Sequence, residues 1–432
     1  MAKTMAHFWP EMGLWLGRMA DTRDQDSITY PRRFLFWTAS MAFLLKLGSR
    51  RKLRFELDSR TALANLNRLS QSAMESRAHS DTVEHFLSHV PTGAVEKIRH
   101  QMIQRLIRMK VLDYGRLHGH FLLVLDGTGQ LHFRRRHCEH CLERTRDGQT
   151  HYYHQVLEAK LVTPDGLALS VASEFIENTD PKATKQDCEL KAFGRLADKI
   201  KKQYPQLRLC LCMDALYANG AVFTICEKNG WKYFITFKPG SLPALWTEYQ
   251  SLLPLCPSNR KVVQVDESTR QQFAWVEGME HIDNHHRRHT VNAFDCLEQR
   301  GHNHADSYFA WLTNFSIHPD TVAELANQGA RCRWKIENEG FNIQKNGGFN
   351  LEHAYSTKRR QMHNWYLLLQ ISHLILQLVE RGSLLRQNAQ TSFGSLAAMA
   401  RRLWESIRNV LIPQEALDIA AAARIQIRIN SS

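Results

Sequence analysis

The chain has 432 residues, enough for two or three domains or for one core domain with large appendages. Hydrophobic residues make up 43% and charged residues 23%, so most of the chain is expected to fold into packed globular structure. The 56 Lys and Arg outnumber the 43 Asp and Glu, which gives a net charge of +13 with the histidines neutral. A surplus of this size favours a polyanionic partner, with nucleic acid first and an anionic membrane surface second.

The sequence argues against membrane insertion and secretion. Two apolar runs, 34–48 and 367–379, fall short of the about 18–20 apolar residues of a membrane span, and polar groups interrupt both, so they predict buried helices. The N-terminus lacks the basic head, apolar run and cleavage site of a signal peptide. Nine cysteines without regular spacing indicate free thiols in a reducing compartment. We therefore expect a cytoplasmic protein with no membrane contact.

The first 118 residues have the apolar spacing of helices. Basic side chains cluster at 31–33, 49–54 and 99–110. Each cluster alone is typical of a solvated helix face. Several clusters in one helical segment of a basic protein make DNA contact more credible, so residues 1–118 are interpreted as a helical DNA-binding region. Neither zinc-finger spacing nor a helix-turn-helix signature accompanies them.

From residue 119 the pattern becomes that of a mixed α/β sheet. Apolar runs bounded by turn residues predict three strands, then a helix, a strand, a second helix and another strand up to residue 240. Residues 241–304 have short alternating pieces and are interpreted as a β-rich insertion. Residues 305–355 should complete the core with one strand and a long helix from about Asp320. The remainder, 356–432, is predicted to be helical and is interpreted as an assembly region.

Two acids follow apolar strands of the predicted core. Asp126 ends the run FLLVLD, and Asp214 ends the run LRLCLCMD. A lone ionised carboxylate there is costly to desolvate, although Asp214 could instead cap the helix that follows. Because both acids recur at the same place on strands expected to be neighbours, their carboxylates should lie close together. Such a pair repels unless a divalent cation lies between them.

A third acid comes from the stretch RCRWKIENEGFNIQK (331–345). Glu337 and Glu339 are two positions apart on a predicted helix, so they point to nearly opposite faces and only one can face the sheet. Arg333 lies four residues before Glu337 and shares its face. We therefore expect Glu337 on the packed, basic side and Glu339 in solvent. The alternative for Arg333 and Glu337 is a surface ion pair worth about a few tenths of a kcal/mol.

Three motifs carry a resemblance to a known family: LDGTG (125–129), MDALYANG (213–220) and RWKIENEGFNIQKNGG (333–348). Together they resemble insertion-sequence transposases of the DDE superfamily, which share the RNase H-like fold with retroviral integrases. The resemblance covers about residues 120–355 and extends more loosely to the C-terminus. It implies an RNase H-like mixed-sheet α/β core with a β-rich insertion, flanked by helical N- and C-terminal regions.

In the cut-and-paste branch of that family, the third acid lies in a helical motif of Tyr, Arg, Glu and Lys. Arg333 and Glu337 match its arginine and glutamate by spacing. Ala330 stands in the tyrosine position and Gln344 in the lysine position, with Lys345 one step later. The resemblance thus implies DNA contacts for Arg333 and, as a substitute, for Lys345.

The resemblance further implies that Asp126, Asp214 and Glu337 are catalytic and bind two Mg²⁺ or Mn²⁺ ions. Three carboxylates suit this role, because their oxygen atoms bind hard cations. This trio has no histidine or thiolate, the ligands that zinc prefers. The implied reaction is DNA cleavage and strand transfer of an insertion sequence. The partners would be double-stranded transposon ends and target, with a homodimer synapsed on DNA at the nucleoid. The alternatives are a metal-dependent nuclease without strand transfer and an inactive DNA-binding relative.

A separate signal comes from Cys138 and Cys141, followed by His151 and His154. A Cys-x₂-Cys pair followed by two histidines suggests zinc. The histidines are closer together than in zinc fingers, however, and on a strand they would point to opposite faces. The sequence alone therefore favours these residues as free thiols and ordinary strand histidines over a zinc site.

Overall fold

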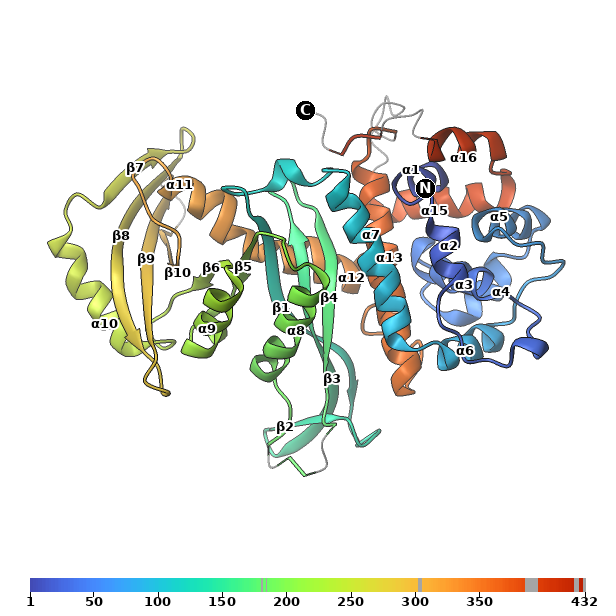
Figure 1. Ribbon diagram of the computed structural model, residues 1–432, viewed down its shortest axis with the longest axis horizontal. Helices are drawn as coiled ribbons and strands as arrows, with labels where there is room; N and C mark the ends of the chain where they lie inside the picture. Colours follow the sequence, from blue (N-terminus) through green and yellow to red (C-terminus); the bar gives the residue numbers. More distant parts are fainter. Residues whose placement is uncertain (180–181, 184, 302–304, 385–394, 423–426, 430–432) are drawn as a thin grey trace.

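A single sheet runs through the part of the chain that the structure describes. The structure is a computed structural model that describes all residues except 180–181, 184, 302–304, 385–394, 423–426 and 430–432. In these described residues the sheet has ten strands in the order β2-β3-β1-β5-β6-β10-β9-β8-β7, with β4 pairing with β3. Helices from both ends of the chain gather beyond β4, so the molecule is elongated (Figure 1).

The central part of the sheet is mixed. β1 (Phe121–Phe133), β3 (Gln149–Val162) and β4 (Ala168–Ile176) pair antiparallel, whereas β1, β5 (Leu209–Met213) and β6 (Lys232–Thr236) pair parallel. Parallel neighbours need a crossover, and the crossovers here contain α8 (Glu189–Gln203) and α9 (Gly220–Asn229). A short strand, β2 (Leu142–Arg146), forms a hairpin with β3. The predicted fold class, a mixed α/β core between two helical regions, is confirmed.

Residues 241–304 extend this same sheet. They begin with α10 (Pro243–Leu252) and continue with β7 (Arg260–Gln264), β8 (Thr269–Ile282) and β9 (Arg288–Arg300). β10 (Ser307–Thr313) joins β9 to β6 by antiparallel pairing on both sides. The strands that the sequence assigned to an insertion therefore continue the core sheet edge to edge.

The two apolar runs form buried helices, as predicted. α3 (Arg32–Leu44) is buried from Phe34 to its end, and α13 (Arg359–Arg381) is buried on all sides over most of its length. Buried polar side chains of α13 bind neighbouring backbone: Asn364 donates to the carbonyls of Leu87 and Val90, each at 2.8 Å. Among the helices of the described residues, none is long and apolar enough to cross a membrane.

α13 and α7 lie side by side between β4 and the other helices from the two ends of the chain (Figure 1). α13 packs against β4, α3, α6 and α7. Helices from the two ends of the chain also contact each other, α1 with α16 and α5 with α15. Besides α3 and α13, the two ends of the chain contribute the helices α1 (Ala2–Phe8), α2 (Met12–Gly17), α4 (Arg50–Glu56), α5 (Arg60–Ser70), α6 (Ser80–His89), α7 (Thr92–Arg108), α15 (Leu396–Asn409) and α16 (Gln414–Ala421).

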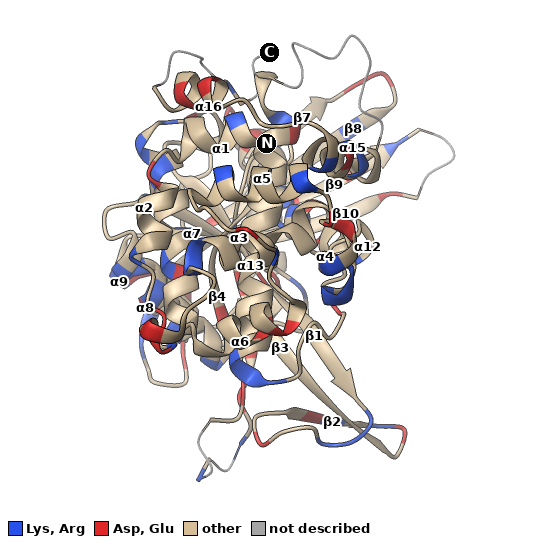
Figure 2. Ribbon diagram, turned by 90° about the vertical axis from the view of Figure 1, so that its right-hand side faces the viewer, with Lys and Arg blue, Asp and Glu red and all other residues tan. Residues whose placement is uncertain are grey.

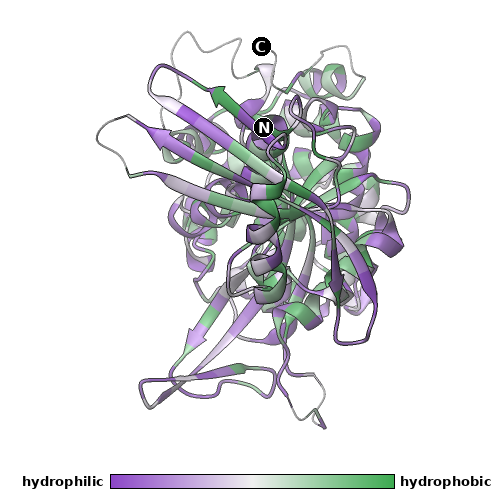
Figure 3. Cartoon of the chain, turned by 90° about the vertical axis from the view of Figure 1, so that its left-hand side faces the viewer, coloured by the Kyte–Doolittle hydropathy of each residue, from purple (hydrophilic) through white to green (hydrophobic). Residues whose placement is uncertain are grey.

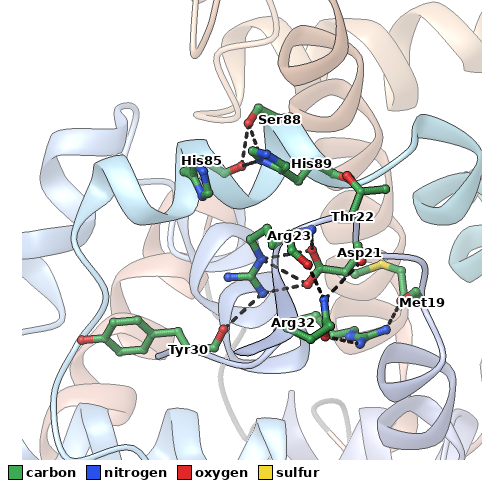
Figure 4. A network of polar contacts seen from close by, with 10 residues as sticks. Met19, Asp21, Thr22, Arg23, Tyr30, Arg32, His85, Ser88 and His89 are labelled. Atoms are coloured by element: carbon green, nitrogen blue, oxygen red, sulfur yellow. Dashed lines mark hydrogen bonds and ion pairs between the residues drawn. The ribbon is translucent and has the colours of Figure 1, made fainter. Parts of the chain in front are cut away.

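The loop between α2 and α3 is held by basic side chains (Figure 4). Arg23 pairs with Asp21 at 2.7 Å, and the two side chains are 6% and 0% exposed. Arg32 donates to a backbone carbonyl of this loop, and the Thr22 hydroxyl donates to the carbonyl of His89 on α6 at 2.8 Å. A basic residue of the 31–33 cluster thus stabilises the fold.

Other members of the basic clusters are also paired within the protein. Arg50 lies 2.7 Å from a carboxylate oxygen of Glu84, and Arg105 lies 3.2 Å from one of Glu11. Arg51 and Lys52 on α4 remain exposed, and Figure 2 shows basic residues along this helix. The basic surface that the N-terminal helices offer is therefore smaller than the clusters suggested.

A buried polar cluster joins α7, β3, β4 and α13. The Arg99 guanidinium donates to the hydroxyls of Ser170 at 2.8 Å and Ser173 at 2.6 Å. Both serines donate in turn to the Glu158 carboxylate, which also accepts from the Tyr366 hydroxyl at 2.8 Å. Arg99 and Glu158 are 3.8 Å apart, with side chains 1% and 0% exposed. The charges of Arg99 and Glu158 thus face each other beside the two serine hydroxyls, and the buried Lys160 lies close enough for its charge to interact with that of Glu158.

Removing one member of this pair should be strongly destabilising. Arg99→Met leaves the Glu158 carboxylate buried without its counter-charge, which costs about 3–5 kcal/mol of unfolding free energy. The control is Arg288→Ala, which breaks an exposed pair with Glu280 and should cost at most about 1 kcal/mol. Urea denaturation followed by circular dichroism measures both. Equal losses in the two variants would contradict the cluster's role.

Candidate active site

Asp126 and Asp214 lie on neighbouring strands. The parallel register of β1 and β5 runs from Phe121 opposite Leu209 to Val124 opposite Cys212. Continued by two residues, this register places Asp126 beside Asp214. Asp126 does not end its strand, as the sequence had suggested, because β1 continues to Phe133 in its pairing with β3. It lies instead where the parallel neighbour β5 ends.

Asp214 also caps the turn that follows β5. Its Oδ1 accepts a hydrogen bond from the backbone N–H of Leu216 at 2.9 Å, at the start of the 3₁₀ turn η3 (Ala215–Tyr217). Asp214 is thus a cap, as the alternative for this residue expected, but of this short turn; Asn219 caps the longer helix α9 that follows. A cap needs only one carboxylate oxygen, so it is compatible with a second role for Asp214.

The third acid comes from a helical segment that crosses the sheet. This segment contacts β1, β3, β4, β5 and β6. Gly329 allows the close approach, because a Cβ there would lie 2.6 Å from the Phe234 ring and 2.7 Å from Leu117. The packing thus fixes which residues of the segment face the strand acids.

This segment is helical, as predicted, but it is not one regular α-helix. It consists of α11 (Val322–Glu324), a π-helical stretch (Leu325–Gly329), a 3₁₀ stretch (Ala330–Trp334), a second π-helical stretch (Ile336–Asn342) and α12 (Ile343–Asn346). Glu337 lies in the second π-helical stretch. Departures of this kind from the α-helix are frequent at functional sites.

Arg333 bridges two of the three acids. Its Nη1 lies 3.2 Å from Oε1 of Glu337 and 3.8 Å from Oδ2 of Asp126. The two carboxylates therefore cannot be further apart than the sum of these distances. The side chain of Arg333 is 12% exposed and that of Asp126 is 21% exposed, against 41% for Glu337. The group is thus a partly buried site open on the Glu337 side, and not only a surface ion pair.

Glu339 is not solvated, so that expectation is wrong. Its side chain is 28% exposed, less than that of Glu337, and it lies 3.5 Å from Lys335. The reason is that the helical segment is covered on both sides. A Cβ at Gly166, in the turn before β4, would lie 3.4 Å from Oε1 of Glu339. Sequence spacing separated the two glutamates correctly but could not tell that both faces are packed.

A fourth acid, Glu189, joins the site from the first turn of α8. It accepts a hydrogen bond from Gln155, and the Tyr217 hydroxyl donates to its Oε2 at 3.5 Å. Any Cβ at position 127 would collide with the Glu189 carboxylate, so Gly127 makes room for it. The sequence analysis missed Glu189. The glycine directly after Asp126 was the available signal, since it indicates a close approach.

The site carries more negative than positive charge. Burial raises the pKa of Asp126 to about 7; Arg333 opposes this shift, whereas Glu337 and Glu189 reinforce it. Burial, followed by the charge of Asp214, also raises the pKa of Glu189. Four carboxylates around one described arginine are stable only if some are protonated or a cation joins them.

The donor set fits hard divalent cations. Asp126, Asp214, Glu189 and Glu337 offer only oxygen ligands, which Mg²⁺ and Mn²⁺ prefer. Among the residues that the structure describes, no three of these acids have ligand atoms all within 4.8 Å of one another.

The other predicted site residues lie elsewhere. Gln344, in the lysine position of the family motif, is buried and donates to Gln370 at 2.8 Å, so it faces the core. Lys345 is 2.9 Å from Glu352, and no described contact links it to the acids. Cys138 and Cys141 come together at the start of β2, away from the acids.

Comparison with solved structures finds similarity to a transposase complex. A cryo-EM structure of the piggyBac transposase synaptic complex with hairpin DNA aligns over 98% of this chain and 84% of that chain. The TM-score is 0.44 and the sequence identity is 10%, values that do not assign the chain to a family. No protein-family model and no curated protein matches the sequence.

Asp126 should make the stability of the metal-free protein depend on pH. Its folded-state pKa lies above the unfolded value, so its contribution is complete below about pH 4 and is lost as the pH rises through about 7. In EDTA, the melting temperature of Asp126→Asn should therefore fall less between about pH 5 and pH 8 than that of the wild type. Differential scanning fluorimetry measures this difference.

Magnesium should reverse the effect in the wild type. Mg²⁺ should raise the wild-type melting temperature more at about pH 8 than at about pH 5, because binding requires the ionised carboxylate. Asp126→Asn should show little of this gain. The control Asp147→Asn, which changes a side chain that is 91% exposed, should behave like the wild type. A full magnesium response in Asp126→Asn would contradict the assignment of Asp126 to a cation site.

Proposed function

We propose that the protein is a DDE-type DNA transposase that cleaves and joins DNA strands with Asp126, Asp214 and Glu337 as metal ligands. The observation that carries the proposal is the Arg333 bridge. It joins Asp126 of β1 to Glu337 of the crossing segment, beside the strand that leads to Asp214. The three motifs that resemble the DDE superfamily contain these same four residues.

Two Mg²⁺ or Mn²⁺ ions bound there would activate a water or a 3′-hydroxyl and stabilise the leaving oxygen of a displacement at phosphorus. The protein's own contribution is to place two ligands on neighbouring strands and the third on the helical segment that packs across them. Arg333 partly compensates the charges of Asp126 and Glu337 when no cation is bound. Once cations take over that role, its guanidinium is free to contact a phosphate oxygen of DNA.

Glu189 is proposed as a positioning residue behind these ligands. Its hydrogen bonds to Gln155 and Tyr217 fix it next to the strand acids, where its charge raises the pKa of Asp126. It would thereby strengthen the attraction of the site for cations without contacting the DNA.

The core is proposed to be RNase H-like. Three antiparallel strands (β4, β3, β1), continued by two parallel strands (β5, β6), support this assignment. We further propose that the helical N-terminal region binds transposon ends through exposed basic residues such as Arg51 and Lys52, and that a homodimer forms on DNA. The net charge of +13 supports an extended phosphate contact.

One observation favours a second candidate, a metal-dependent nuclease without strand transfer. In the DDE family motif a lysine is expected to contact a phosphate. Here Gln344, in the lysine position, is buried, and the neighbouring Lys345 pairs with Glu352, so neither side chain is free to make that contact. Joining of a pre-cut end to a target plasmid distinguishes the two candidates, because only the transposase forms the joined product.

Alanine at Asp126, Asp214 or Glu337 should abolish Mg²⁺-dependent cleavage, by about 10³-fold or more, because each removes a metal ligand. DNA binding, measured by gel mobility shift, should persist in all three variants. The control is Glu339→Ala, which changes the neighbouring carboxylate of the same segment and should retain cleavage. Cleavage surviving in Asp126→Ala would exclude this mechanism.

Glu189→Gln tests the positioning role. The substitution keeps the size of the side chain and removes its charge, so the Mg²⁺ concentration for half-maximal cleavage should rise by about 10-fold. Cleavage at saturating Mg²⁺ should change much less. A loss of the maximal rate as large as that of Asp126→Ala would instead make Glu189 a direct metal ligand.

A further inference from the structure

A second group of metal-type ligands lies where β1 leads into β2. The sulfur atoms of Cys138 and Cys141 are 3.6 Å apart, and Nε2 of His154 lies 3.5 Å from each of them. His137 offers a ring nitrogen within 4.8 Å of the ligand atoms of Cys138 and His154. Cys138, Cys141 and His154 thus bring three ligand atoms together, and His137 lies beside Cys138 and His154 as a fourth candidate ligand.

These distances match a tetrahedral zinc site. With Zn–S bonds of about 2.3 Å and Zn–N bonds of about 2.0–2.1 Å, tetrahedral angles place two sulfurs about 3.8 Å apart and a sulfur and a nitrogen about 3.6 Å apart. The structure has 3.6 Å and 3.5 Å. Two thiolates with two imidazoles form a donor set typical of zinc, unlike the oxygen ligands of the acidic site.

The surroundings of His154 support metal binding. Its Nδ1 is buried and makes no hydrogen bond, and it points to Oε1 of Glu177 at 3.9 Å. Glu177 is fixed from behind by His363 and Arg359, each at 2.8 Å. Histidines that bind zinc through one nitrogen commonly present the other to a carboxylate held in this way. A small movement of the His154 ring would shorten the distance from its Nδ1 to Oε1 of Glu177 and complete that arrangement.

The short spacing between His151 and His154 does not count against zinc, because these two histidines do not act as a pair. His151 is exposed and lies on the other face of β3. His137 replaces it, directly before Cys138. Three of the ligands thus come from one loop and the fourth from a strand, as in many closed structural sites.

The site lies at the base of the β2–β3 hairpin. This hairpin projects from the body of the molecule (Figure 1), and hydrophilic residues make up much of it (Figure 3); residues 143–151 are exposed. The loop that carries the ligands has no regular secondary structure, and two hydrogen bonds of 2.9 Å attach His140 and Cys141 to Asn178. An arm with so little apolar core needs a further constraint to hold a fixed direction.

We propose that His137, Cys138, Cys141 and His154 form a structural zinc site that fixes the β2–β3 hairpin as a rigid arm. The site is closed, with four protein ligands and no position for a substrate, so its role is structural. Exposed Arg134, Arg135 and Arg144 lie on this arm. The proposal does not depend on the proposed function, because neither the ligands nor the arm includes the acids.

The test is the metal content of the full chain purified without added zinc or chelator. We expect about one zinc per chain, lost in the double variant C138S/C141S. Cys188→Ser, which changes an exposed cysteine, should retain the zinc. Asp126→Ala should retain it as well, which separates this site from the acidic one. Zinc content that is unchanged in C138S/C141S would overturn the proposal.

Cobalt substitution of the wild-type chain gives a second readout, needed if the double variant does not fold. Co²⁺ in place of zinc should produce the absorption of a tetrahedral ion with thiolate charge transfer. Hydrogen exchange of residues 134–154 should accelerate when a strong chelator removes the metal, while exchange in α13 stays unchanged. Absence of the thiolate band, or oxidation of Cys138 and Cys141 to a disulfide in the purified chain, would overturn the proposal.

Discussion

The parallel pairing of β1 with β5 is the constraint on which the site depends. It places Asp126 and Asp214 side by side, each directly after an apolar run of the chain. Two more carboxylates, Glu189 and Glu337, are then added by packing from α8 and from the crossing segment. The structure relieves part of the repulsion with Arg333 and part by keeping one carboxyl easy to protonate, as the raised pKa of Asp126 indicates. The remaining excess of negative charge favours the binding of cations.

The rest of the fold keeps this charged group in place. Gly127 and Gly329 permit approaches that any side chain would prevent, one to Glu189 and one to the sheet. Beyond β4, α13 is buried over most of its length and connects β4 to the N-terminal helices α1, α3, α6 and α7. The Arg99–Glu158 cluster fixes the same interface with polar contacts that need a particular geometry. Rigid support of this kind suits chemistry that depends on the positions of several carboxylates.

The two proposed metal sites differ in donor type and in position. Oxygen ligands gather at the middle of the sheet, around Asp126, where an open side leaves room for a substrate. Sulfur and imidazole ligands gather at the base of the β2–β3 hairpin, around Cys138, in an arrangement with no open position. Hard and soft ligands select different ions, so the two sites need not compete for metal.

The sequence by itself determined the strands of the core, the buried character of α3 and α13, and the acids Asp126, Asp214 and Glu337 with Arg333 as a neighbour. These follow from periodicity and spacing, which report the environment of a residue within its own element. Only the tertiary structure revealed Glu189, the burial of Glu339, His137 beside Cys138, and the pairing of basic residues such as Arg50 and Arg105 within the protein. Each of these depends on contacts between segments far apart in the chain, and the pattern of one segment does not encode what covers its other face.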